Sequence, residues 1–195
     1  MHKTDAWMWS GDIMQSVKPK GTATVEDLLN MPEDGLKHEL VNGEIVVSPA
    51  GWEHSKITIK ISHILATFLD AHPIGELGSS ELGIWLAGGN LRSPDVTFIR
   101  SEKVPKGEKQ RAFLESIPDL AVEVLSPSDR SKFVQAKIRE FLENGVPIVW
   151  LVDPAQKTVT EYRSLSEIKL YSGDDVIHAD PVLPGFSCAI SRFFK

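Results

Sequence analysis

Two stretches of the chain show the hydrophobic spacing of amphipathic helices. In residues 54–70 the apolar side chains recur three and four residues apart, which predicts a helix with one buried face. The segment between Asp129 and Gly145 shows the same spacing, with Ser128 or Asp129 as the N-cap and Gly145 at the end. The inner positions of the second helix are Phe133, Val134, Ile138 and Phe141. A shorter helix is predicted over residues 24–31.

Short apolar runs bounded by turn residues predict the strands. Residues 120–125 form a short apolar run and residues 148–152 an unbroken one, as is typical of buried strands. Asn42-Gly43 separates two strand-like runs and predicts a hairpin. The remaining strands are expected at residues 75–86 and 91–99, joined across Gly88-Gly89-Asn90, and at residues 158–163 and 168–171, followed by an aromatic-rich capping segment over residues 183–194.

The order of these elements predicts an α/β sandwich around a mixed central β-sheet, flanked by helices and extended by β-hairpins. Residues 1–21 show no sustained hydrophobic period and are expected to form a poorly ordered arm. The 195 residues, of which 42% are hydrophobic, are enough for a sizeable core, so residues 22–195 are predicted to form a single domain.

Composition excludes several classes of protein. No apolar run approaches the roughly 20 residues of a membrane span, and no signal-peptide pattern is present, so we expect a cytoplasmic protein without membrane contact. The single cysteine, Cys188, excludes an intrachain disulfide and a cysteine zinc site. A net charge of −6 argues against a broadly basic nucleic-acid surface. The densest positive charge lies in residues 101–117, a lysine-rich loop that is either simply solvated or the best candidate for phosphate contacts.

Two ionisable residues stand at positions predicted to be buried. Glu123 interrupts the apolar run 120–125, and Lys137 lies within the apolar face of the helix that follows. An unpaired buried carboxylate is costly, so it usually finds a partner, shifts its pKa or binds a metal. A structural ion pair, a lysine that extends to solvent and an active site all remain open. His54 and Asp95 are further candidates, although each alone is more typical of a structural role.

The arrangement resembles the active-site signature of the PD-(D/E)XK nuclease superfamily. Pro94-Asp95 is followed after 27 residues by Glu123, and then by the inward-facing lysine. The flanking sequence is similar to the Uma-type "putative restriction endonuclease" family over roughly residues 22–194. Five ordered blocks carry this resemblance: HELVNGE at 38–44, SPDV at 93–96, PDLAVEVLSPS at 118–128, WLVDP at 150–154 and LPGF at 183–186.

The resemblance implies a restriction endonuclease-like fold and a set of site residues. Asp95 and Glu123 would bind Mg²⁺, or Mn²⁺ in its place, and the main-chain carbonyl of Val124 would add a ligand. The superfamily places its lysine two residues after the glutamate, where this chain has Leu125. The resemblance implies that Lys137 takes over this role from the helix.

The family pattern also implies that Glu39 is an additional acidic member of the site. His54 stands where the family commonly has a histidine, with a less defined role. These residue types suit hydrolysis of a phosphodiester bond, because a metal held by carboxylates can polarise a phosphate and activate water.

Two functions follow as hypotheses. The first is a metal-dependent endonuclease that acts on DNA, and the second is a non-catalytic or regulatory binding protein that retains the fold. A double-strand cutter needs two sites related by a two-fold axis, and the C-terminal half is rich in aromatic residues. We therefore also predict a homodimer formed through that half.

Overall fold

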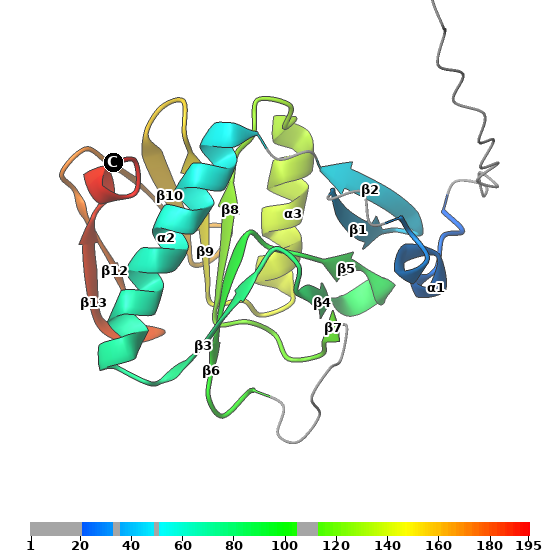
Figure 1. Cartoon of the computed structure of the whole chain (residues 1–195), viewed down its shortest axis with the longest axis horizontal. Coiled ribbons are helices and arrows are strands. Elements are labelled where there is room, and N and C mark those ends of the chain that lie inside the picture. The colour runs from blue at the N-terminus through cyan, green and yellow to red at the C-terminus, as the bar shows by residue number, and fades with distance from the viewer. Residues whose placement is uncertain (1–20, 33–35, 49–50, 105–112) are drawn as a thin grey trace, which may run out of the picture.

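The computed structural model describes residues 21–32, 36–48, 51–104 and 113–195. In this part of the chain, a six-stranded mixed sheet forms the centre of the molecule (Figure 1). Its strands, in spatial order, are β11 (Ile168–Ser172), β10 (Thr158–Tyr162), β9 (Ile148–Asp153), β8 (Leu120–Val124), β6 (Val96–Arg100) and β3 (Gly75–Ser79). β8 and β9 run parallel, whereas the other neighbours in this sheet are antiparallel.

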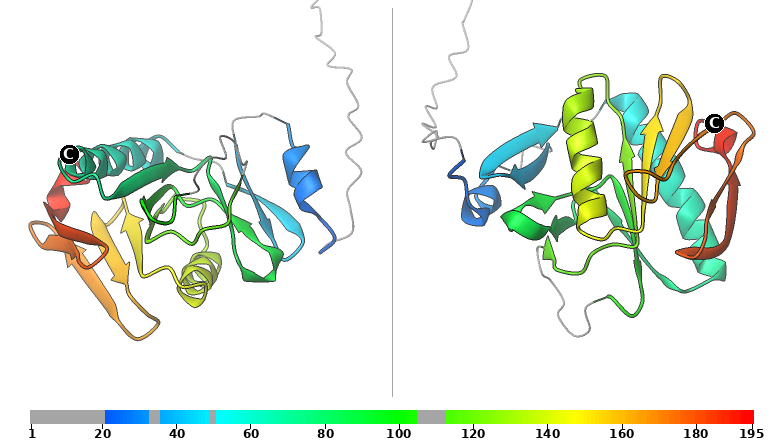
Figure 2. Two further views of the ribbon diagram at one scale, coloured as in Figure 1. Left: turned by 90° about the horizontal axis from the view of Figure 1, so that it is seen from below. Right: turned by 180° about the vertical axis from the view of Figure 1, so that it is seen from behind.

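Two long helices cover opposite faces of the six-stranded sheet (Figure 2). α2 (Trp52–Ala71) packs on one face and α3 (Ser131–Glu143) on the other. β8 and β9 lie between both helices, which explains why their sequences are almost continuously apolar. The predicted fold class, a mixed sheet flanked by helices, is therefore confirmed.

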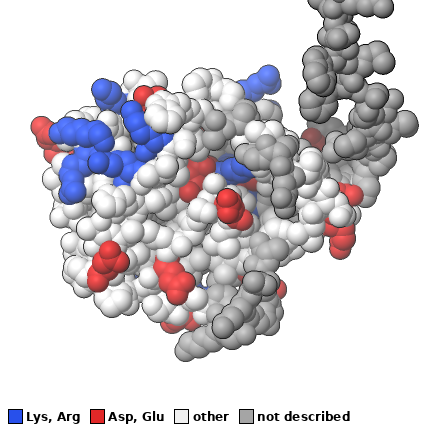
Figure 3. Space-filling view, in the orientation of Figure 1, with Lys and Arg blue, Asp and Glu red and all other residues white. Residues whose placement is uncertain are grey.

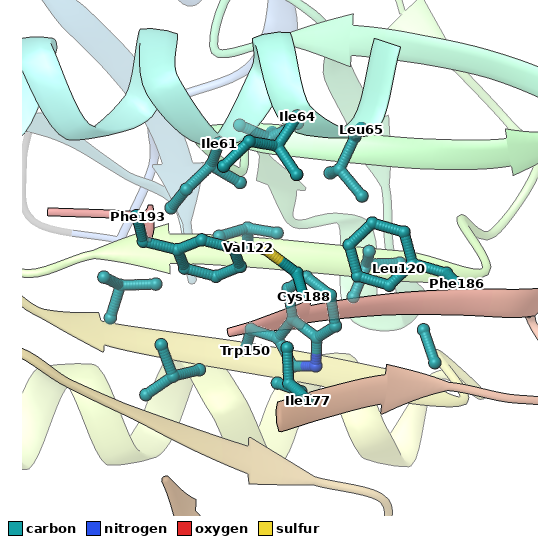
Figure 4. Packing of buried hydrophobic residues seen from close by; sticks show 14 of the residues in the cluster. Ile61, Ile64, Leu65, Leu120, Val122, Trp150, Ile177, Phe186, Cys188 and Phe193 are labelled. Atoms are coloured by element: carbon teal, nitrogen blue, oxygen red, sulfur yellow. The ribbon is translucent and has the colours of Figure 1, made fainter. Parts of the chain in front are cut away.

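The larger core lies on the α2 side of the sheet. Trp150 is fully buried there, close to side chains of α2 and of the hairpin β12 (Val176–Ala179) and β13 (Leu183–Ala189) (Figure 4). Its indole N–H donates a hydrogen bond to the carboxylate of Glu161 at 3.0 Å, so the buried polar group is satisfied. The chain ends with a short 3₁₀ turn, η2 (Ile190–Arg192).

A second, smaller sheet lies beside the first (Figure 1). Its strands, in spatial order, are β2 (Glu44–Ser48), β1 (Lys37–Val41), β5 (Leu91–Arg92), β4 (Gly83–Trp85) and β7 (Phe113–Leu114). The predicted hairpin is confirmed, since Asn42 and Gly43 join β1 to β2 with φ values of 50° and 72°. α1 (Val25–Leu29) packs against this sheet and begins at Thr24, which forms a capping box with Asp27.

The prediction of two long strands at residues 75–86 and 91–99 was wrong. Each stretch is divided, so that β4 pairs with β5 in the small sheet while β3 pairs with β6 in the large one. The turn at residues 80–82 interrupts the first stretch. Pro94, which has no N–H to donate to a ladder, lies in the break of the second. Between β4 and β5 the chain forms a short 3₁₀ turn, η1 (Ala87–Gly89).

The start of α3 also differs from the prediction. Its N-cap is Arg130, because the carboxylate of Asp129 instead accepts the main-chain N–H of Ser126 at 2.7 Å. Phe133, expected on the inner face, is 65% exposed. It lies in the first turn of the helix and lines a cleft, whereas Ile138 and Phe141 are buried as predicted. The end at Gly145 is confirmed by its φ of 88°.

The C-terminal segment contains a hairpin that the sequence did not predict. β12 and β13 pair antiparallel, and their inward-facing side chains pack into the larger core. The aromatic side chains of this half that motivated the homodimer are mostly buried: Tyr162, Tyr171, Phe186 and Phe193. They contribute to the core of the chain, so the homodimer stays a prediction without support from an exposed aromatic surface.

Two further expectations concern the remaining segments. Residues 1–20 of the predicted arm lie outside the described residues, as do the cations Lys106, Lys109 and Arg111. Lys103 is described, and its ammonium pairs with Asp119 at 2.8 Å, which indicates a structural role. Among the described helices, none is long and apolar enough to cross a membrane.

Candidate active site

A cleft of about 730 Å³ is lined by residues of both sheets and of α3. The small sheet contributes Lys37 and Glu39 from β1, and the large sheet contributes Asp95 and Glu123. Lys137 of α3 completes the set. The structure therefore brings together all four residues that the sequence identified as catalytic candidates.

The two carboxylates predicted as metal ligands are neighbours across adjacent strands. Val96 pairs with Val122 in the antiparallel ladder, which places Asp95, one residue earlier, opposite Glu123. The main-chain N–H of Asp95 donates to the carbonyl of Val122 at 3.0 Å and fixes this position. Glu123 leaves the sheet on the face covered by α3, where it meets Lys137, whereas Asp95 lies just before β6.

Asp95 is held by two donors on the same oxygen. Its Oδ2 accepts the main-chain N–H of Val124 at 2.8 Å and lies 2.9 Å from Nε2 of His54. Because an ionised carboxylate only accepts hydrogen bonds, Nε2 of His54 carries the proton in this contact. His54, whose role the sequence left undefined, thus positions Asp95 from the first turn of α2.

The main chain of Val124 also faces this site. In a strand, the N–H and carbonyl of one residue point to the same side, so the Val124 carbonyl lies on the side of its N–H, toward Asp95. This orientation agrees with the predicted role of the Val124 carbonyl as an additional oxygen donor.

Lys137 reaches the acidic pair from α3, as the sequence predicted. Its Nζ lies 2.7 Å from Oε1 of Glu123 and 2.9 Å from Oε1 of Glu39. The side chains of Lys137 and Glu123 are each 13% exposed and that of Glu39 is 3% exposed, so water screens these contacts only weakly. The displaced lysine therefore occupies a position between two buried carboxylates.

Glu39 connects the site to a second ion-pair network. Its Oε1 accepts the main-chain N–H of Ser93 at 2.7 Å, and its Oε2 lies 3.3 Å from Nη1 of Arg92. The Nη2 atom of Arg92 in turn lies 2.6 Å from Oε2 of Glu140 on α3. Asn90 donates from its side-chain amide to the other oxygen of Glu140 and accepts the main-chain N–H of Asn42.

Burial and charge act in opposite directions on the acidic residues. Burial alone would raise the pKa of Glu39, but Lys137, Lys37 and Arg92 lower it from 4.5 to about 2. Burial would also raise the pKa of Asp95, whereas the hydrogen bond from His54 and the charge of Lys37 hold it well below its usual range. Both groups are therefore ionised at neutral pH.

Glu123 and Lys137 shift differently. Burial raises the pKa of Glu123, and the nearby charges of Asp95 and Glu39 add to this effect against the opposing lysines. Burial would lower the pKa of Lys137, but Glu123, Glu39 and Asp95 raise it above its ordinary value. Lys137 is therefore a permanent cation at neutral pH.

The lowered pKa of Glu39 predicts a dependence of stability on pH. A group whose pKa is lower in the folded state stabilises the fold above its unfolded pKa, and this contribution is lost as pH falls toward the folded value. For Glu39 the loss amounts to about 3 kcal/mol between about pH 5 and pH 2. Denaturant unfolding across this range should show a smaller loss for Glu39→Gln than for the parent.

The matched control for this measurement is Glu143→Gln, because Glu143 is 60% exposed. Glu123, with a raised pKa, acts in the opposite sense and favours folding at low pH. It is present in all three proteins, but the charge of Glu39 contributes to its raised pKa, so the difference between the slopes reports Glu39 together with its effect on Glu123. Equal slopes in the parent and Glu39→Gln would mean that Glu39 is not held ionised by its neighbours.

The donor set of the site suits a hard divalent cation. Among the described residues, no three His, Cys, Asp or Glu side chains are arranged to hold a metal. The donors are instead two carboxylates, of Asp95 and Glu123, and a main-chain oxygen. Mg²⁺ keeps several waters and is usually bound through one or two carboxylates, so this set is sufficient.

Sequence reasoning did not identify Lys37, Arg92 or Glu140. Lys37 stands two residues before Glu39 on one strand, so the alternation of side chains could have placed both on the same face. Arg92 and Glu140 belong to elements that are distant in sequence, and the separation of β5 from β6 brings them together. No sequence pattern around Arg92 or Glu140 indicates that they belong to the site.

A mixed sheet flanked by helices, with two acids on neighbouring strands and a lysine above them, defines a restriction endonuclease-like protein. Residues 25–191 match the Uma2 family, described as "Putative restriction endonuclease", and the chain belongs to this family. The family resemblance inferred from the sequence is therefore confirmed.

A solved structure with the same fold supports this assignment. The crystal structure of a protein from Anabaena variabilis ATCC 29413, described as a "putative nuclease", superposes with a TM-score of 0.77. The alignment covers 88% of this chain and 97% of that chain at 23% sequence identity, so the likeness shows the fold. No curated protein matches the chain. The family and the fold together support a nuclease function.

Proposed function

We propose that the protein is a metal-dependent endonuclease that hydrolyses phosphodiester bonds of DNA. The observation that carries this proposal is the contact between Lys137 and Glu123 at 2.7 Å, beside Asp95 on the neighbouring strand. It supports an acid–acid–lysine site in which the lysine comes from α3. An ion pair with a purely structural role would not need the second acid, Asp95, to be buried beside it.

Each residue of the site has a role in this proposal. Asp95, Glu123 and the Val124 carbonyl would hold Mg²⁺ or Mn²⁺, which when bound polarises the phosphate and lowers the pKa of a water. Lys137 would stabilise the negative charge that develops on the phosphate. Glu39 is proposed to orient Lys137, and His54 to keep Asp95 ionised and correctly placed.

The alternative is a non-catalytic or regulatory binding protein. A net charge of −6 favours it, because nucleic-acid affinity depends on neutralising phosphates. Figure 3 shows that Lys and Arg side chains gather toward one end of this face, while Asp and Glu are distributed across it. A cytoplasmic location and a homodimer remain predictions from the sequence.

Nicking of a supercoiled plasmid tests the proposed function. We expect cleavage with Mg²⁺ or Mn²⁺, none with EDTA, and a loss of about 100-fold or more in Glu123→Gln, which removes the charge but keeps the shape. Glu143→Gln on the exposed side of α3 is the control and should cleave at the parent rate. Metal binding without cleavage by any of these proteins would favour the binding-protein alternative.

A further inference from the structure

We propose that Lys37 pairs with the same carboxylate oxygens that a divalent metal would use, so that metal binding releases its ammonium toward the substrate phosphate. This inference rests on the proposed function. Lys37 is not part of the acid–acid–lysine signature, but it would compete directly with the metal for the carboxylate oxygens.

The contacts of Asp95 define which oxygen a metal would take. Oδ2 accepts hydrogen bonds from Val124 and His54, both held by secondary structure. Oδ1 faces Lys37, whose Nζ lies 2.8 Å away. Because two donors already occupy the lone pairs of Oδ2, a cation approaches Asp95 most readily through Oδ1.

Glu123 shows the same division. Its Oε1 pairs with Lys137 at 2.7 Å, and its Oε2 lies 4.0 Å from Nζ of Lys37. The oxygens of the two acids that remain for a metal are therefore Asp95 Oδ1 and Glu123 Oε2. The Lys37 ammonium lies within 4.0 Å of both.

A divalent ion and an ammonium cannot both be close to these oxygens. Mg²⁺ binds carboxylate oxygens at about 2.0–2.1 Å and brings its own water shell, so Nζ of Lys37 must move away. Repulsion between the two cations in a largely buried site adds to this steric conflict. The Lys37 side chain is 14% exposed and extends from β1 into the cleft, so its flexible stem can turn toward the cleft opening.

Lys37 and Lys137 therefore have different roles. Lys137 is fixed by close contacts with Glu39 and Glu123, which persist when a metal takes the other oxygen of Glu123. Lys37 has one close contact, to Asp95, and one longer contact, to Glu123, and loses both. A phosphate bound next to the metal is the anion that Lys37 can reach, and this contact would recover the lost electrostatic energy.

Metal titration of Lys37→Met tests the competition directly. Calorimetry with Mn²⁺, in the absence of DNA, should give a Kd about tenfold lower for Lys37→Met than for the parent, because the competing cation is gone. Plasmid cleavage by the same variant at saturating Mn²⁺ should fall about tenfold or more, because the phosphate contact is lost. Lys56→Met is the control, since Lys56 is 48% exposed and pairs with Glu53 outside the site.

The outcomes separate this inference from the proposed function. Equal or weaker Mn²⁺ binding by Lys37→Met than by the parent would overturn the competition while leaving a metal-dependent nuclease intact. Tighter binding with undiminished cleavage would overturn the phosphate contact. If neither protein binds Mn²⁺, the metal-dependent function itself fails and the inference fails with it. Lys37→Gln, which retains a polar end, replaces Lys37→Met in both measurements if the methionine variant does not give the parent circular dichroism spectrum.

Discussion

Replacing Lys137 by methionine is expected to lower plasmid cleavage by at least about 100-fold, which is the usual effect of removing one charged contact from a transition state. The raised pKa of Lys137 keeps it charged at neutral pH, so it can stabilise the developing phosphate charge without first gaining a proton. The rate should be measured at saturating Mn²⁺, because the lysine is not a metal ligand and its loss should act on the chemical step.

Folding must be measured beside activity in this variant. Lys137 is the shared partner of Glu39 and Glu123, so its removal leaves two buried carboxylates without their nearest cation. The double variant Lys137→Met with Glu39→Gln removes one of these charges and should recover part of the stability. Its cleavage should remain low, which separates the catalytic effect from the structural one.

The position of the lysine gives a second test. Leu125 is two residues after Glu123 and leaves the strand on the same face, where the superfamily signature has its lysine. Adding Leu125→Lys to Lys137→Met should restore part of the cleavage, because the ammonium returns to the site from β8. Rescue should be incomplete, since Leu125 packs beside the α3 core. Parent-level cleavage by Lys137→Met alone would reduce Lys137 to a structural ion-pair partner.

Local patterns were sufficient to predict the main elements of the site. The apolar run around Glu123 identified β8, and the helical period of Ile138 and Phe141 placed Lys137 on the inner face. An ionisable residue within each of these patterns conflicts with burial unless it has a partner. The contact between Glu123 and Lys137 resolves both conflicts, which is why the sequence could predict it.

Contacts between the two sheets could not be predicted in this way. The run 91–99 looks continuous in sequence, yet Arg92 belongs to the small sheet and Val96 to the large one. This division brings Lys37, from a hairpin more than 50 residues earlier, to Asp95. Which sheet a strand joins depends on the packing of the whole chain, so it cannot be predicted from the hydrophobic period of one segment.

Removing Arg92 should have a large effect on the free energy of unfolding. Arg92 is 8% exposed and lies between Glu39 of β1 and Glu140 of α3, so it joins the small sheet to the helix that carries Lys137. Arg92→Met leaves both carboxylates without this cation. Breaking a buried ion pair from one side typically costs about 3–5 kcal/mol, and we expect a decrease of this size in the free energy of unfolding.

A control variant and a second substitution test whether the loss of stability comes from the ion pairs of Arg92. Arg139→Met, on the exposed side of α3, removes a 3.8 Å contact with Glu143 between side chains that are about 60% exposed, and should cost less than about 0.5 kcal/mol. Adding Glu140→Gln to Arg92→Met removes one unpaired charge and should return part of the lost stability in denaturant unfolding. If Arg92→Met and Arg139→Met unfold at the same denaturant concentration, the Glu39 and Glu140 carboxylates do not depend on Arg92. The link between the small sheet and α3 would then rest on its remaining contacts, of which the pair between Glu39 and Lys137 is the closest to the proposed chemistry.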